Sequence, residues 1–246
     1  MTNELLQALQ LLKSKEWVDL THTFGPDSPH FFMFADAKFD TLFSHDDGFF
    51  AQQFTFPGQY GTHIDPPIHF VRDTRYLDEL ELKELVLPLI VINKSKESSL
   101  NHDFSLGVQD ILDFEAEYGE IDAGTFVALR TDWSKRWPDK ESFNNKDEDG
   151  HNHIPGWGLE ALQFLFKERK VSAVGHETFD TDSAADFRKN GGKLDGEYYV
   201  LDQDTYQIEL MTNLDKLPPK GAVIFNIVPK PEKASGFPVR SFAILP

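Results

Sequence analysis

The segment from residue 59 to residue 70 constrains the fold more than any other part of the chain. It reads Gln-Tyr-Gly-Thr-His-Ile-Asp-Pro-Pro-Ile-His-Phe. Pro66 and Pro67 both lack a backbone N–H, and Pro67 also disfavours helical geometry at the residue before it. A continuous helix therefore cannot pass through this segment, and we expect it to be extended or turned.

Several side chains of this segment are of the kinds that bind divalent metals. His63, Asp65 and His69 follow one another at intervals of two and four residues, and Gln59 lies four residues before His63. Because alternate residues of an extended segment share a face, the two histidines and the aspartate are expected to point to one side. Two imidazoles and a carboxylate suit a metal site or a proton-transfer site. The residues alone leave an alternative open, because many histidines are hydrogen-bonded core residues.

The charge balance bears on the class of partner. The chain has 41 acidic and 24 basic residues, a formal net charge of −17, and no Lys/Arg cluster. Nucleic acids and anionic membranes require a basic face, so we expect a small-molecule substrate and neither of those partners. The first residues lack a signal-peptide pattern, and no stretch approaches the roughly 20 apolar residues of a membrane span. The expected location is therefore cytoplasmic.

The absence of cysteine limits the chemistry of the chain. Disulfides are excluded, and any zinc would be held without thiolates. Most of the 22 phenylalanines are expected in the core. Phe31, Phe32 and Phe34 lie in a loop-like region, and four others precede the metal motif: Phe49, Phe50, Phe54 and Phe56. Some of these seven could wall a flat or aromatic substrate, since ligand pockets are mostly apolar.

The pattern along the chain indicates a single domain over residues 1–246, of the mixed α/β class, in which strands outnumber helices. Residues 1–15 contain leucines at helical spacing and predict an amphipathic helix. We expect this helix to pack on its own domain or on a sister subunit rather than on a membrane. Residues 138–153 are polar and irregular and predict a surface excursion whose two histidines lie in solvent. Residues 186–196 are expected to form a loop.

The motif Gly61-Thr62-His63-x-Asp65-x-Pro67-x-His69-Phe70 resembles the signature of the metal-dependent cyclase family, which includes bacterial kynurenine formamidase and isatin hydrolase. The resemblance extends over nearly the whole chain, through Asp19–His22, Leu129–Trp133, Val174–Ser183, Ile208–Pro218 and Pro238–Arg240. It implies a compact mixed β/β/α cyclase-like fold around a metal site. Members of the family are commonly dimers or tetramers, so the resemblance also implies a homo-oligomer.

Two positions depart from the family pattern. Gln59 stands where the family usually has its first metal-binding histidine, and Glu197 falls near the position of another histidine in many members. Both changes replace imidazole by oxygen, which shifts the preference from zinc toward manganese or magnesium. We therefore expect a divalent metal, manganese or zinc, and whether one or two ions bind stays open.

The resemblance implies Gln59, His63, Asp65 and Glu209 as metal ligands and His69 and Glu209 as catalytic groups. The implied reaction is hydrolysis of an acyl C–N or C–O bond in a cyclic amide, an N-formyl amide or a lactone by a metal-activated water. Two alternatives stay open. The chain could be a metal-dependent lyase or cyclase, or a non-catalytic ligand-binding relative whose site is weakened at Gln59. His176 and Glu177 are expected either to orient the ligands or to have no role, and His22 could line the site.

Overall fold

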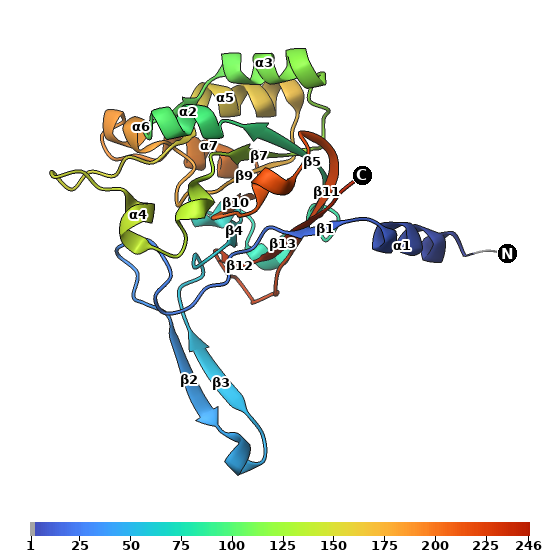
Figure 1. Cartoon of the computed structure of the whole chain (residues 1–246), viewed down its shortest axis with the longest axis vertical. Helices are drawn as coiled ribbons and strands as arrows, with labels where there is room; N and C mark the ends of the chain where they lie inside the picture. Colours follow the sequence, from blue (N-terminus) through green and yellow to red (C-terminus); the bar gives the residue numbers. More distant parts are fainter. Residues whose placement is uncertain (1–2) are drawn as a thin grey trace.

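A nine-stranded mixed sheet forms the centre of the protein, whose computed structural model describes residues 3–246 (Figure 1). The strands follow the order β1-β13-β11-β5-β7-β9-β10-β4-β12 across the sheet. Their bounds are Trp17–Asp19 for β1, His63–Asp65 for β4, Val86–Asn93 for β5, Phe126–Arg130 for β7, Ala173–His176 for β9, Gln207–Glu209 for β10, Lys220–Ile227 for β11, Phe237–Pro238 for β12 and Arg240–Ile244 for β13.

The four strands β5, β7, β9 and β10 are parallel neighbours, and the other neighbouring pairs are antiparallel. Parallel neighbours need crossover connections, and here helices supply them. The helices span Ser95–Leu100 (α2), Val108–Tyr118 (α3), Leu159–Phe164 (α5, continued by a π-helical turn over Leu165–Arg169), Ala184–Lys189 (α6) and Asp195–Asp202 (α7). They gather on one side of the sheet (Figure 1). The predicted mixed α/β class is confirmed.

Strand β5 shows how the sheet is packed on both faces. Ile90 and Ile92 lie in the core beneath the helices, while Leu87 and Leu89 lie in a second core on the other face. Fully burying side chains of this size contributes about 1.5–3 kcal/mol each. Pro88 is tolerated because the ladder with β7 begins only at Leu89.

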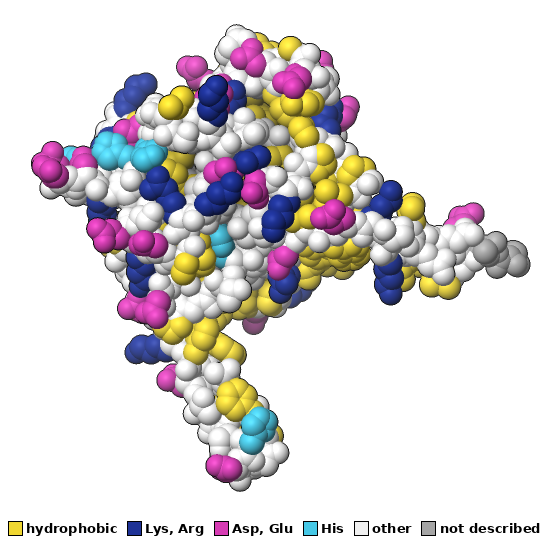
Figure 2. Space-filling view, in the orientation of Figure 1, with side chains coloured by type: hydrophobic (Ala, Val, Ile, Leu, Met, Phe, Trp, Pro, Cys, Tyr) yellow, Lys and Arg dark blue, Asp and Glu magenta, His cyan; other side chains and the backbone are white. Residues whose placement is uncertain are grey.

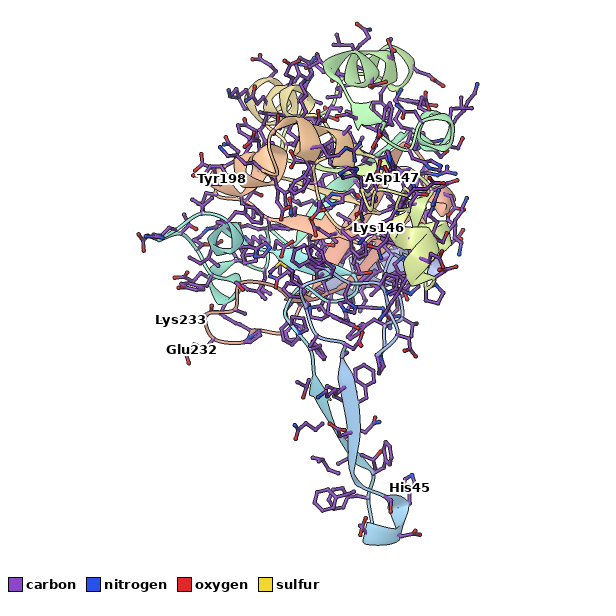
Figure 3. The ribbon with its side chains drawn as sticks, turned by 90° about the vertical axis from the view of Figure 1, so that its left-hand side faces the viewer. His45, Lys146, Asp147, Tyr198, Glu232 and Lys233 are labelled. Atoms are coloured by element: carbon purple, nitrogen blue, oxygen red, sulfur yellow. The ribbon has the colours of Figure 1, made fainter. Side chains whose placement is uncertain are left out.

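Two elements project from the body (Figure 1). Helix α1 (Glu4–Ser14) confirms the predicted helix, but none of its residues is buried, so it does not pack on its own domain. The hairpin of β2 (Lys38–Phe43) and β3 (Ala51–Thr55) points away in another direction. Figure 3 shows His45 at the hairpin tip, far from the body.

The excursion over residues 138–153 is only partly on the surface. Its stretch 148–151 is exposed, but helix α4 (Lys140–Asn144) carries Phe143, which is fully buried against Phe179 at 4.7 Å between ring centroids. Of its two histidines, His151 is exposed, whereas His153 is half-buried and lies between two carboxylates, one of them Asp103 at 2.7 Å. The excursion is thus anchored to the body at its helical start. The small strands β6 (Ser105–Leu106) and β8 (Gly156–Trp157) pair beside it.

The prediction of a loop over residues 186–196 is wrong at both ends. Helix α6 continues to Lys189, and α7 begins at Asp195. Ser183 caps α6 by accepting the backbone N–H of Asp186, and Asp182 accepts the first N–H groups of α7. These side chains accept the backbone N–H groups that lack a partner at the start of each helix. The apolar pattern of such short helices does not show where they begin. Within residues 3–246, none of the helices is both long and apolar enough to cross a membrane.

Candidate active site

The pairing of β4 with β10 assembles the polar floor of the site. Glu209 lies opposite His63, and Gln207 lies opposite Asp65. Ile64, between them on β4, points into the core on the other face. Because side chains alternate along strands and opposite residues are close, the four polar side chains share one face. The expectation that His63 and Asp65 point to one side therefore agrees with the structure.

His63 directs a free ring nitrogen at two carboxylates. Its Nδ1 lies 2.8 Å from the carbonyl oxygen of Gly61, so Nδ1 donates a proton there and Nε2 is the ring nitrogen that a metal could take. Nε2 lies 3.3 Å from Asp65 Oδ2 and 3.3 Å from Glu209 Oε2. The ligand atoms of all three residues lie within 4.8 Å of one another. Donors bound to one metal at about 2.1 Å are separated by roughly 3 Å, so this spacing fits a common ion.

The charges of this cluster also favour a cation. His63 Nε2 and Asp65 Oδ2 are buried and have no hydrogen-bond partner. Burial by itself lowers the pKa of His63, but the carboxylates of Asp65 and Glu209 outweigh it and raise that pKa well above its usual value. Burial raises the pKa of Asp180 to about 7, and the neighbouring Glu209 carboxylate adds to this. The donor set therefore fits a divalent metal, which would neutralise the clustered carboxylates.

Glu209 is held by neighbours on β9 and β10. Gln207 donates its amide N–H to Glu209 Oε1 at 3.0 Å and accepts the Thr181 hydroxyl at 2.6 Å. His176 Nε2 lies 3.4 Å from the same Glu209 oxygen. Gln207 was not predicted as a site residue, although its position two residues before Glu209 on a strand puts it on the same face as Glu209. Glu177 lies elsewhere: it accepts hydrogen bonds from Thr131 and Ser134 and ties the ends of β7 and β9 together.

Gln59 reaches the site from the segment before β4. Its amide nitrogen donates to Asp65 Oδ1 at 3.2 Å and to the carbonyl oxygen of Ser235 at 2.8 Å. The nitrogen must face Ser235, because two carbonyl oxygens would repel each other there. A Cβ atom at Gly236 would collide with this amide and lie 2.9 Å from Asp65 Oδ1. The close approach of a glycine therefore sets the position of Gln59.

His69 joins the site from a turn. The extended geometry ends at Asp65, and Pro67–His69 forms a 3-10 turn. His69 Nε2 lies 3.9 Å from Asp65 Oδ1 and 3.9 Å from Oε1 of Glu197, which stands on α7. Burial, followed by the Glu209 and Asp65 carboxylates, raises the pKa of Glu197 well above its usual value. Asp65, His69 and Glu197 form a second group of potential metal ligands beside the first.

A cavity of about 170 Å³ opens above these side chains. Its walls are largely apolar, formed by Phe31, Phe34, Phe70, Phe179, Leu194 and Leu210, and the polar residues on it are Gln59, His63, His69, Asp180, Glu197 and Glu209. The predicted wall role of Phe31 and Phe34 agrees with this arrangement. The other phenylalanines proposed as walls lie outside the cavity lining: Phe32, Phe49, Phe50, Phe54 and Phe56. His22 also lies outside it; its ring stacks on Trp137 with 4.4 Å between centroids.

Known proteins are similar to this chain in sequence and in fold. The family model described as "Putative cyclase" matches residues 18–183. The isatin hydrolase of Roseibium aggregatum is 34% identical over an alignment that covers 94% of this chain and 92% of that protein. Isatin hydrolase A from Labrenzia aggregata, solved with benzyl benzoate, has 31% identity and a TM-score of 0.91 over 99% of both chains.

A second solved structure, an isatin hydrolase bound to the product analogue thioisatinate, has 31% identity and a TM-score of 0.92 over all of both chains. The match of the family model covers more than half of the chain, and the curated relative exceeds 30% identity over almost its whole length. The chain therefore belongs to the cyclase family, and it is a metal-dependent hydrolase.

Proposed function

We propose that the chain hydrolyses the amide bond of a small cyclic amide that carries an aromatic ring, and that isatin is the first substrate to test. The observation that carries the proposal is the combination of a histidine–carboxylate cluster with an aromatic-walled cavity of about 170 Å³. Apolar, mostly aromatic walls around a few polar groups suit a small flat molecule such as a fused two-ring amide. The curated relative named above is an isatin hydrolase, which supports this choice.

We propose His63, Asp65 and Glu209 as ligands of one divalent ion, with Gln59 contributing its carbonyl oxygen. The amide nitrogen of Gln59 is already engaged with Asp65 and Ser235, so its oxygen is the atom left to ligate. When bound, such an ion would lower the pKa of a water molecule and polarise the substrate carbonyl. The set contains one nitrogen donor, and its other donors are oxygens, so manganese is favoured over zinc.

His69 is the proposed proton carrier. It lies on the cavity wall; its Nε2 faces Asp65 and Glu197 at 3.9 Å, and its Nδ1 lies 3.4 Å from the amide nitrogen of Gln59. As the water oxygen bonds to the carbonyl carbon, His69 takes the released proton. It then delivers that proton to the nitrogen as the C–N bond breaks. Glu209 is the second group able to accept the proton, because it lies in the same cluster.

Two substitutions separate metal binding from turnover. We expect His63→Ala to lose the metal, since it removes a buried donor, and His69→Ala to retain the metal while kcat falls about 100-fold or more. Metal content by plasma mass spectrometry and turnover of isatin are measured on both variants. His45→Ala, on the exposed hairpin tip, is the matched control. Unchanged turnover in His69→Ala would remove the proton-transfer role.

The substrate class is tested with a panel of isatin, an aryl N-formyl amide and an aryl lactone, each with Mn²⁺ and with Zn²⁺. We expect ring opening of isatin to be fastest, and the N-formyl amide tests the kynurenine formamidase-like activity that the sequence motif implies. Reaction in ¹⁸O-labelled water must place the label in the product carboxylate. Failure of all three substrates with both metals would contradict the proposed substrate class.

A further inference from the structure

A small apolar cluster lies behind one wall of the cavity, and we call it the rear cluster. Its buried members are Trp133, Phe143, Ile154 and Leu210, and three partly buried residues pack against them: Trp137, Phe179 and Ala184. Phe179 and Leu210 also line the cavity. Phe143 comes from α4, within the excursion over residues 138–153. The rear cluster therefore connects the excursion to the cavity.

Phe143 packs directly against the wall residue Phe179. Its side chain is fully buried, and the centroids of the two rings lie 4.7 Å apart in an edge-to-face arrangement. The ring of Phe143 also contacts Trp137, with 5.9 Å between centroids. Because a protein interior is close-packed, the side chain at position 143 fixes how far Phe179 can move away from the cavity.

Hydrogen bonds hold the backbone of α4 in place. The indole N–H of Trp133 donates to the carbonyl oxygen of Phe143 at 3.0 Å, and Arg136 Nη1 donates to the carbonyl oxygen of Ser142 at 2.8 Å. At the start of the helix, Asp139 accepts the backbone N–H of Ser142 at 3.0 Å. A smaller or larger side chain at position 143 therefore changes the space beside Phe179 and does not shift the helix.

The main chain around Phe179 is also held, whereas its ring can rotate. The carbonyl oxygen of Thr178 accepts the backbone N–H of Leu210 at 3.2 Å, and the hydroxyl of Thr178 donates to the carbonyl oxygen of Asp180 at 3.1 Å. The ring of Phe179 is only partly buried and lies between the cavity and the rear cluster. A change of side-chain volume at position 143 is therefore taken up by rotation of this ring.

The rest of the excursion faces solvent. Figure 2 shows acidic and histidine side chains together at the projecting left-hand end of the body, where Figure 1 places the end of the excursion. None of the residues 138–153, all of which the structure describes, lines the cavity. The excursion therefore acts on the cavity through the contact of Phe143 with Phe179.

We propose that Phe143 sets the size of the ring system that the cavity accepts, because it holds Phe179 in the cavity wall. This inference rests on the proposed function, since it gives the same cavity a limit on ring substituents. Phe143 does not line the cavity, so it is a positioning residue that acts through Phe179. A smaller side chain at position 143 lets Phe179 turn away from the cavity and admits a ring substituent. A larger side chain presses Phe179 into the cavity and excludes that substituent.

Substitutions of both kinds at position 143 test the proposal. The ratio kcat/KM is measured for isatin and for the four isatins that carry one bromine on the aromatic ring. We expect Phe143→Leu to raise kcat/KM for at least one bromoisatin, relative to isatin, about tenfold, and Phe143→Trp to lower it about tenfold, because one small group in an apolar pocket has effects of this order. The change should appear in KM for the bromoisatin, as expected when binding alone is altered.

Phe114→Leu is the matched control. Phe114 is a buried phenylalanine of the core beneath the helices and does not line the cavity. The control loses the same atoms as Phe143→Leu, so its stability should fall as well, while its preference between bromoisatin and isatin stays at the wild-type value. Circular dichroism verifies that each variant is folded, and Phe143→Met, which conserves more of the volume, replaces a variant that does not fold.

Crystal structures of the wild type and of Phe143→Leu give a readout that needs no turnover. We expect the Phe179 ring to move by about 1 Å or more toward position 143, into the space that the smaller side chain leaves. If the wild type hydrolyses none of the proposed substrates, the proposed function is contradicted, and the displaced ring still supports the inference. A Phe179 ring that stays in place, or a preference for bromoisatin that changes equally in Phe143→Leu and Phe114→Leu, overturns the inference.

Discussion

Replacing Thr62 by Val tests whether one hydroxyl joins three segments of the site. Thr62 is 1% exposed; its Oγ1 donates to the carbonyl oxygen of Leu210 at 2.6 Å and accepts the backbone N–H of His22 at 2.9 Å. Thr62 directly precedes His63, and Leu210 directly follows Glu209. Leu210 has a left-handed φ of 55°, which is costly for a leucine and persists only where neighbours hold it.

The magnitude follows from the groups that lose a partner. Valine has nearly the same shape as threonine, so the change creates no cavity but leaves a buried N–H and a buried carbonyl oxygen unpaired. Each unpaired buried group costs about 1–3 kcal/mol, so we expect the free energy of unfolding to fall by about 3 kcal/mol. For a chain of this size, 1 kcal/mol corresponds to about 2–4 °C, so Tm should fall by about 6–12 °C.

Differential scanning calorimetry of the purified protein measures this change. Thr62→Ser is the matched control, because it keeps the hydroxyl and loses one methyl group, and its Tm should stay closer to that of the wild type. Activity of the valine variant should fall as well, since the same bond positions His63 and Glu209. A valine variant that melts within about 1 °C of the wild type would refute the reasoning, because it would mean that the unpaired groups cost little.

Two further predictions concern the pH dependence of stability and the close contact between Gly236 and Gln59. Burial lowers the pKa of His22 to about 4 from 6.5, so below pH 6.5 the unfolded chain binds a proton that the folded chain does not. The stabilising contribution of neutral, buried His22 is therefore fully present above about pH 6.5. The free energy of unfolding should fall by up to about 3 kcal/mol as the pH is lowered toward 4. The free energy of unfolding, measured by urea at several pH values, should fall less steeply with decreasing pH for His22→Gln than for the wild type. If it falls equally steeply for His22→Gln and for the exposed control His45→Gln, the prediction is contradicted. Gly236→Ala should lower metal affinity about tenfold by displacing Gln59. Calorimetric titration with the metal measures the affinity, and Gly25→Ala is the control because a Cβ at Gly25 meets no atom within 4 Å. Equal affinities for Gly236→Ala and Gly25→Ala would contradict the prediction.

The motif around β4 shows which features of the site could be predicted from neighbouring residues in the sequence. The Pro-Pro step excluded a helix, and the period of two along His63 and Asp65 placed both on one face, because strand geometry alone determines that alternation. The position of His69 was less readable, since the chain turns after Asp65 and a turn has no fixed side-chain period. The missed helices α6 and α7 were short segments whose caps come from Ser183 and Asp182.

The sequence by itself determined the mixed α/β class, the amphipathic helix at the start of the chain and the side to which His63 and Asp65 point. Only the tertiary structure decided that Glu209 lies opposite His63, that Gln207 holds Glu209, and that phenylalanines from distant segments close the cavity. The physical reason is that local periodicity fixes the direction of neighbouring side chains, whereas contacts across the sheet depend on strand order and register, which a single residue shift would invert.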